Sequence, residues 1–101
     1  MLSEAAKMRR CPGILFADGP AGRRARIEGT GIEVWELIGS FLALKKDERR
    51  LAAAYDFLTP RQIRAALGYA AAYPEEIRAL VEINAATEAT IDLPFARRAR
   101  R

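Results

Sequence analysis

Residues 47–73 read DERRLAAAYDFLTPRQIRAALGYAAAY and predict two short helices joined by a tight turn. Thr59 can cap the free backbone donors of the second helix, and Pro60 suits the first helical position because its missing N–H would have no partner there. Gln62 follows Thr59 by three residues, which is the spacing of a capping box. These signals place the start of the second helix at Thr59–Pro60 and are typical of a helix-turn-helix.

The second helix has an apolar face and a basic beginning. Its apolar residues recur at helical spacing: Ile63, Ala66, Leu67, Ala70 and Ala71. Arg61, Gln62 and Arg64 fall elsewhere on the first two turns. Such side chains read base edges when the N-terminal end of a recognition helix enters a major groove, so we predict that these three contact DNA. A solvated helix face with ordinary capping has the same spacing, and the spacing alone does not separate the two.

Length, composition and charge indicate one small, basic, helical domain. A chain of 101 residues is long enough for one core and not for two, and its alanine content favours helices over a thick β core. The formal net charge is +4, and the positive charge is gathered in residues 1–26, 45–64 and 91–101. Such segregation is typical of a nucleic-acid footprint, although charge runs are often only solvated faces.

The same composition argues against several classes of protein. Cys11 is the one cysteine and histidine is absent, so we expect no internal disulfide, no Cys/His metal site and no thiol activated by a histidine. We therefore predict no enzyme activity and no cofactor. No apolar run reaches the roughly 20 residues that span a bilayer, and a secretory signal is not evident. A reduced, cytoplasmic setting without membrane insertion is the expectation.

The first third of the chain predicts an arm and a hairpin. Residues 1–11 are read as a flexible N-terminal arm, with a brief helix as the alternative. Residues 14–16 form an apolar run, turn-forming residues fill 18–22, and Ala25 and Ile27 then alternate with charged residues, which together predict a small β-hairpin. Arg24 and Arg26 lie on the other side of the second strand and are candidate DNA contacts.

Two helices are expected before the helix that begins at Thr59. Residues 34–44 repeat apolar side chains as an amphipathic helix does, with Trp35 off the stripe as a core-edge residue or a contact for a second chain. Residues 45–55 should form the first helix of the central pair, and the inward side chains would be Leu51, Ala52 and Tyr55. Phe57 and Leu58 are expected to plug the turn. The basic residues at the start of the predicted helix 45–55 are candidate phosphate contacts: Lys45, Lys46, Arg49 and Arg50.

Pro74 should end or kink the helix before it, because proline disfavours helical geometry in the preceding residue. A further helix then carries an apolar stripe to about Thr87, and Glu75 and Glu76 in its first turn complement the helix dipole. Residues 88–101 are read as a basic C-terminal tail, either disordered or folding on a partner. Its candidate partner-binding residues are Leu93, Phe95, Arg97 and Arg98. The predicted fold is mainly α: a small helical bundle over residues 12–87, with a helix-turn-helix and a short N-terminal β-hairpin.

Two strings, GRRARIEGTGIEVWELI (residues 22–38) and LTPRQIRAALGYAAAYPEEI (residues 58–77), resemble a family of small bacterial and archaeal proteins. This family is catalogued as domain of unknown function 433 and grouped with VapB-type antitoxins, and the similarity covers about residues 12–83. Commoner members carry a Gly-Thr-Arg-Ile-Pro-Val run in the hairpin region. Gly31 and Glu33 replace its arginine and proline here, while the helical half matches well.

The resemblance implies a homeodomain-like helix-turn-helix, often dimeric, encoded beside a toxin of the PIN-like ribonuclease kind. The antitoxin would neutralise that toxin and repress its own operon by binding operator DNA. Such ribonucleases gather acidic side chains around magnesium, so Arg97 or Arg98 of the tail would pair with those acids. The alternative is a protein-interaction module, for dimerisation or toxin binding, that has the same fold and never binds DNA.

Overall fold

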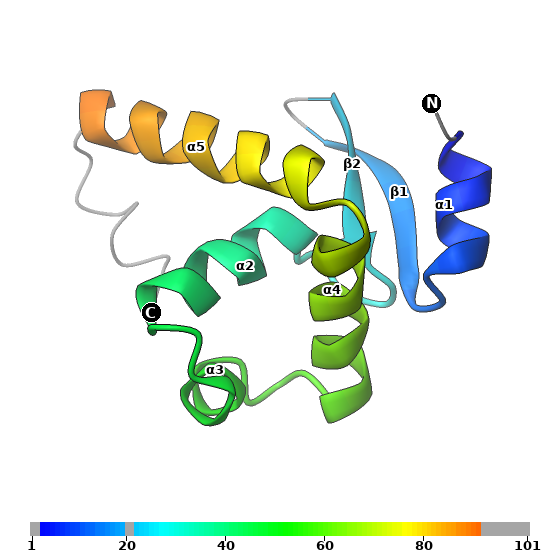
Figure 1. Ribbon diagram of the computed structural model, residues 1–101, viewed down its shortest axis with the longest axis horizontal. Coiled ribbons are helices and arrows are strands. Elements are labelled where there is room, and N and C mark those ends of the chain that lie inside the picture. The colour runs from blue at the N-terminus through cyan, green and yellow to red at the C-terminus, as the bar shows by residue number, and fades with distance from the viewer. Residues whose placement is uncertain (1–2, 20–21, 92–101) are drawn as a thin grey trace.

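The computed structural model describes residues 3–19 and 22–91, with side chains described as far as residue 84. It consists of a two-stranded hairpin and a set of helices (Figure 1). The elements follow in the order α1 (Glu4–Arg10), β1 (Ile14–Gly19), β2 (Gly22–Ile27), α2 (Val34–Ala43), α3 (Glu48–Ala54), α4 (Pro60–Ala72) and α5 (Pro74–Ile91). The predicted mainly helical fold with an N-terminal β-hairpin is thus confirmed.

The hairpin is antiparallel, with Ile14 opposite Ile27 and Phe16 opposite Ala25. These four side chains lie on the face turned toward the helices, because side chains alternate across a strand. Ile14, Ala25 and Ile27 are buried. Two strands alone are marginal in water, so this face depends on the helices that cover it.

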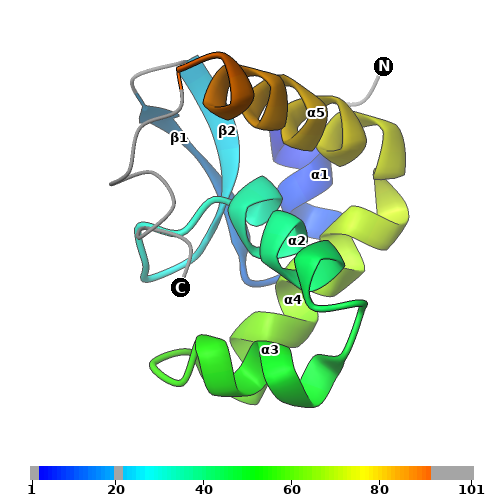
Figure 2. The ribbon, with the colours of Figure 1, turned by 90° about the vertical axis from the view of Figure 1, so that its left-hand side faces the viewer.

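Helix α2 is the centre of the helical part. Figures 1 and 2 both show it between α5 on one side and α3 on the other. Val34 and Leu37 are fully buried and Ile38 nearly so, which confirms the first part of the predicted stripe. Leu42, at the end of that stripe, is 45% exposed. Ser40 contacts the C-terminal end of α3 through a 2.8 Å hydrogen bond between its Oγ and the Tyr55 hydroxyl.

Helix α3 begins later than predicted, at Glu48 instead of Lys45. Lys45 and Lys46 adopt left-handed backbone conformations, with φ of 61° and 59°. Their backbone N–H groups donate to Leu42 O (3.0 Å) and Phe41 O (2.8 Å), so they close the C-terminus of α2 as a Schellman motif. Asp47 then caps α3, its Oδ1 accepting from Arg50 N at 3.1 Å.

Three predictions of burial around α3 need correction or refinement. Leu51 and Leu58 are buried as expected, and Tyr55 is half-buried. Ala52 is exposed instead of inward, because the short helix turns only its Leu51 side to α2. Phe57 is 64% exposed, so Leu58 alone fills the turn between α3 and α4.

Helix forms at residues 4–10, and α5 extends further than the sequence patterns indicated. Residues 4–10, predicted as a flexible arm, form helix α1, which Ser3 caps by accepting from Ala6 N at 3.2 Å. Helix α4 ends at Ala72, with Tyr73 as its C-cap, and α5 begins at Pro74, so the predicted break is confirmed. Helix α5 continues to Ile91, beyond the expected end near Thr87. Residues 92–101, with the candidate tail residues Leu93, Phe95, Arg97 and Arg98, lie outside the described part of the chain. Among the described residues, no helix combines the length and apolar character needed to cross a membrane.

Candidate nucleic-acid interface

The start of α4 is built as the sequence predicts. Thr59 Oγ1 accepts from Gln62 N at 3.1 Å, and Gln62 Oε1 accepts from Thr59 N at 2.8 Å, so the capping box is complete. Gln62 Nε2 also donates to the carbonyl of Glu28, at 3.4 Å, in the turn after β2. The Gln62 amide is therefore engaged in capping and in a contact with the turn after β2, and its reading of a base stays a prediction.

The buried side of α4 is centred on a residue that the sequence pattern did not single out. Ile63, Ala66 and Tyr69 are buried, and Tyr69 is the largest fully buried side chain among the described residues. Leu67 and Ala70 are only half-buried, and Ala71 is exposed. The tyrosine was missed because its hydroxyl argues against burial until its partner is known.

That partner is Glu76 of α5, at the centre of a small polar network. The Tyr69 hydroxyl donates to both carboxylate oxygens of Glu76 at 3.0 Å. Lys7 Nζ of α1 lies 2.8 Å from Glu76 Oε1 and 5.0 Å from the centre of the Tyr73 ring. Burial raises the pKa of Tyr69 well above its ordinary range, and donation to the Glu76 carboxylate raises it further. The network joins α1, α4 and α5, so Glu76 is more than the helix-dipole partner that was predicted.

The opposite side of α4 is basic and open. Arg61 and Arg64 are exposed, and neither guanidinium has a hydrogen-bond or ion-pair partner among the described residues. Helix α4 contains no acidic residue. Both side chains lie on the first two turns of a helix whose other face is buried. The structure thus leaves the two predicted arginines accessible to a duplex.

The predicted phosphate contacts near α3 are also exposed, but they belong to different elements. Lys45 and Lys46 lie in the turn between α2 and α3, whereas Arg49 and Arg50 lie on α3 itself. Arg50 Nε is 3.9 Å from its neighbour Asp47 Oδ2, a weak pair at the surface. The four basic residues are therefore accessible without forming one helical face.

Arg24 and Arg26 of β2 do not join this open surface. Both are half-buried on the outer face of the hairpin. Arg24 Nη1 lies 3.9 Å from Glu33 Oε1, and Arg26 Nη2 donates to the Asp18 carbonyl at 3.4 Å. Trp35 Nε1 donates to the same Glu33 carboxylate, which makes Trp35 the edge residue of this cluster. Both side chains make their described contacts with the hairpin and with Glu33, and the contact of Arg24 and Arg26 with DNA stays a prediction.

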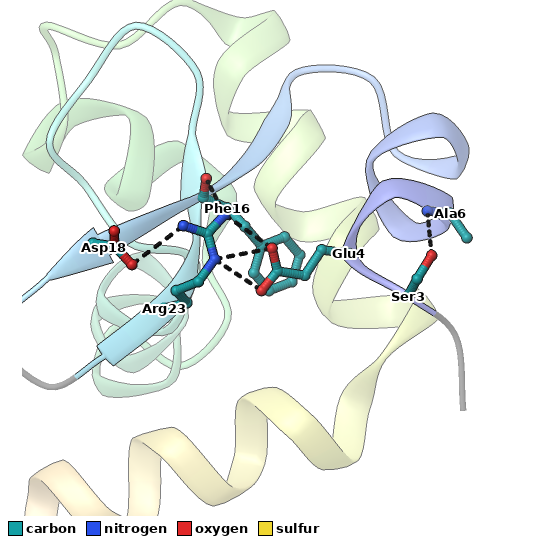
Figure 3. Close-up of polar contacts among 6 residues, drawn as sticks. All are labelled: Ser3, Glu4, Ala6, Phe16, Asp18 and Arg23. Carbon is teal, nitrogen blue, oxygen red and sulfur yellow. Dashed lines mark hydrogen bonds and ion pairs between the residues drawn. The ribbon is translucent and has the colours of Figure 1, made fainter.

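Arg23 of β2 is also paired with acidic side chains at the hairpin (Figure 3). Its Nη2 lies 2.9 Å from Glu4 Oε1 of α1, and its Nη1 lies 3.2 Å from Asp18 Oδ1. Hydrogen bonds to Glu4 and then Asp18 raise the pKa of the guanidinium above its ordinary value. These contacts tie α1 to the hairpin.

A shallow, open depression of about 270 Å³ lies between α4 and the connection from α1 to β1. Its walls are mainly apolar and come from both segments: Arg10, Cys11, Pro12, Ala65, Gly68, Tyr69 and Ala72. The connection lies close to the helix, since a Cβ added to Gly13 would be 3.1 Å from Ala65 Cβ. Arg10 is exposed at this depression.

Residues 17–70 match the family model described as Protein of unknown function (DUF433). The chain belongs to this family. A crystal structure of a DUF433 member protein from Anabaena variabilis is similar to it, with 31% sequence identity and a TM-score of 0.58. The similarity covers 77% of this chain and 75% of that one. No curated protein matches the chain.

The matched segment of the DUF433 family runs from β1 through most of α4. It includes the capping box and both open arginines of α4. Helices α1 and α5 lie outside it, so the network of Lys7, Tyr69 and Glu76 joins the family segment to the elements that flank it.

Proposed function

We propose that this DUF433 protein binds operator DNA through α3 and α4 and acts as the antitoxin of a toxin–antitoxin pair. It would repress its own operon and neutralise a PIN-like ribonuclease, as a cytoplasmic homodimer that binds and does not catalyse. One observation carries the DNA-binding part. Arg61 and Arg64 are exposed and unpaired within the described residues, at the N-terminal end of a helix that is held rigidly on its other side.

The chemistry of arginine fits this position. A guanidinium presents planar donors that pair with the two acceptors of a guanine edge, and it stays charged at any physiological pH. The capping box and the burial of Ile63, Ala66 and Tyr69 fix the direction from which these groups leave the helix. Arg49, Lys45 and Lys46 would contact phosphates, which position a protein on the duplex without reading sequence.

The antitoxin part depends on the resemblance to VapB-type proteins and on the basic tail. Because α5 continues to Ile91, the segment proposed to reach the toxin is residues 92–101, with Leu93 and Phe95 as apolar anchors and Arg97 and Arg98 as charged ones. The arginines would pair with the acidic side chains of a magnesium-dependent ribonuclease site.

DNA binding is tested with a labelled duplex from the region upstream of the protein's own gene and a scrambled duplex of equal length. We expect tighter binding to the first, weakening steeply as salt rises. Arg61→Ala and Arg64→Ala should each reduce the preference for the natural duplex by about 5-fold to 150-fold, because a good base contact is worth about 1–3 kcal/mol. Equal binding of the two duplexes by wild type and variants would contradict base reading by α4.

Toxin neutralisation is tested with the ribonuclease encoded next to this gene. A chain ending at Ile91 keeps every described helix intact, and we expect it to lose most of the inhibition. The variant with Arg97 and Arg98 both changed to glutamine should lose inhibition while retaining DNA binding. Full inhibition by the shortened chain would remove the tail from the proposal.

The second candidate is an interaction module that does not bind DNA, and the turn between α3 and α4 favours it. Phe57 is 64% exposed there, with its ring 5.9 Å from that of Tyr55. A large exposed aromatic ring often marks a protein contact. If wild-type protein fails to shift either duplex at low salt, and Phe57→Ala weakens toxin binding or dimerisation, this second function is the correct one.

A further inference from the structure

The basic surface around α4 extends onto a segment that the family match does not include. Arg10 ends helix α1, and the connection after it packs against α4 at Ala65. Ala65 lies one helical turn after Arg61, and Gly68 lies one turn after Arg64, so each arginine shares a helix face with a residue that lines the depression beside Arg10. Arg10, Arg61 and Arg64 therefore border one stretch of surface.

These three arginines are alike in that none of them is paired with an acid among the described residues. Each is exposed, and none has a hydrogen-bond or ion-pair partner within residues 3–19 and 22–84. The residues that line the depression beside Arg10 include no acid. The charge on this surface is thus available to an anion, whereas Lys7, in the same helix as Arg10, is already neutralised by Glu76.

The α4 side of the depression is smooth. Ala65, Gly68 and Ala72 carry little or no side chain, and a Cβ added at Gly68 would meet nothing within 4 Å among the described residues. Packing within the described chain does not require this glycine, which costs a helix about 1 kcal/mol relative to alanine. A surface with small residues allows the backbone of a partner to approach closely.

The spacing fits double-stranded DNA. Gly68 lies seven positions after Arg61, which corresponds to about 10 Å along a helix with a rise of 1.5 Å per residue. The major groove of B-DNA is about 8.5 Å deep, and phosphates border its mouth. When the start of α4 enters the groove, a cation beside Gly68 lies near the phosphate backbone at its edge.

We propose that Arg10 contacts a backbone phosphate at the edge of the groove that α4 enters, so that the end of α1, the small-residue face of α4, and Arg61 with Arg64 form one DNA-binding surface. This inference rests on the proposed DNA-binding function. Arg10 positions the protein without reading sequence, and α1 becomes part of the interface instead of a detached arm. The contacts of Lys7 with Glu76 and of Glu4 with Arg23 hold α1 in the orientation that this role needs.

The test is fluorescence anisotropy with the natural and scrambled duplexes over a range of salt concentrations. We expect Arg10→Gln to weaken binding to both duplexes by the same factor, about 3-fold to 10-fold, and to reduce the slope of log affinity against log salt by about one. Arg10→Lys keeps the charge and should retain the wild-type slope. Arg78→Gln is the matched control, since Arg78 is an exposed arginine of α5 that has no partner among the described residues and does not line the depression. It should bind as wild type does.

Three results would overturn the inference: wild-type affinity and slope for Arg10→Gln, an equal loss for Arg78→Gln, or an equal loss for Arg10→Lys. The second would show a net-charge effect, and the third would show a structural role. If Arg61→Ala still reduces the preference between duplexes in any of these cases, the proposed function stands without Arg10. Absence of duplex binding by the wild-type protein would overturn both.

Discussion

The positive charges of the hairpin and those of helix α4 differ in what faces them. On the hairpin, Arg23 contacts Glu4 and Asp18, Arg24 contacts Glu33, and Arg26 donates to a carbonyl. On α4, Arg61 and Arg64 extend from the surface with no partner among the described residues. Both regions are basic in the sequence, yet two of the three hairpin arginines lie against acids and neither arginine of α4 does, among the described residues. The comparison shows that the number of basic residues in a segment says less about function than the acids folded against them.

Helix α1 contains both kinds of charge within one turn. Lys7 is half-buried against Glu76 and two aromatic rings, whereas Arg10 is exposed. Lys7 holds α1 against α5 through Glu76, whereas the exposed guanidinium of Arg10 is accessible to an anion. The predictions below separate these two uses of charge, beginning with the largest expected effect.

Removing the acid from the buried network should cost the most stability. Glu76→Ala leaves the Tyr69 hydroxyl and Lys7 without their shared partner, and we expect a loss of about 2–3 kcal/mol in the free energy of unfolding. Glu75→Ala is the matched control, because Glu75 is an exposed acid in the same helical turn and should cost about 0.5 kcal/mol or less. Urea unfolding measures both. Equal losses for the two variants would mean that the network adds no stability.

The second prediction concerns alkaline pH. Tyr69 has a raised pKa in the folded state because of burial and of its bond to Glu76, whereas in the unfolded chain it ionises near its ordinary value of about 10. Below that pH the Tyr69 hydroxyl is protonated in both the folded and the unfolded state, and its contribution to the free energy of unfolding is fully present. Above it, only the unfolded state loses the proton, so stability should fall as pH rises, by at most about 1.4 kcal/mol per pH unit. Tyr69→Phe has no proton to lose, and its urea-unfolding stability should fall less steeply between about pH 10 and pH 11. Identical slopes would contradict the prediction.

The smallest effect is expected where pairing occurs at the surface. Arg23→Gln removes the pairs with Glu4 and Asp18, but these side chains are exposed to solvent, so the loss of stability should be much smaller than that of Glu76→Ala and should shrink further as salt rises. Thermal unfolding at two salt concentrations checks this. DNA affinity should be unchanged, and a loss of affinity as large as that of Arg61→Ala would show that pairing does not separate the two groups of arginines.

The sequence was informative where local chemistry decides the structure. The capping box of Thr59 and Gln62, the break at Pro74, the hairpin and the buried start of α2 all follow from residue type and spacing. The open state of Arg61 and Arg64 also followed from helical periodicity, because the apolar side of α4 leaves them on the other side.

The sequence was least informative where distant residues decide the structure. Helix α1 is short and polar, and only its contacts with Arg23 and Glu76 show that it is held in place. Tyr69 is buried with its hydroxyl satisfied, because the carboxylate of Glu76, seven residues later, accepts its hydrogen bond. Arg24 and Arg26 were predicted to contact DNA, and the sequence pattern did not show that both are half-buried, with Arg24 beside Glu33. Periodicity identifies a face, but it does not identify what lies against that face.

The most direct measurement is a titration of ¹⁵N-labelled protein with its natural upstream duplex, followed residue by residue from the backbone amide signals. We predict that the amides of Arg61, Arg64 and Gly68 on α4, and that of Arg10 on α1, shift early and together, while those of Arg23 and Arg24 on the hairpin stay in place. Shifts confined to the hairpin, with α4 unaffected, would contradict the account.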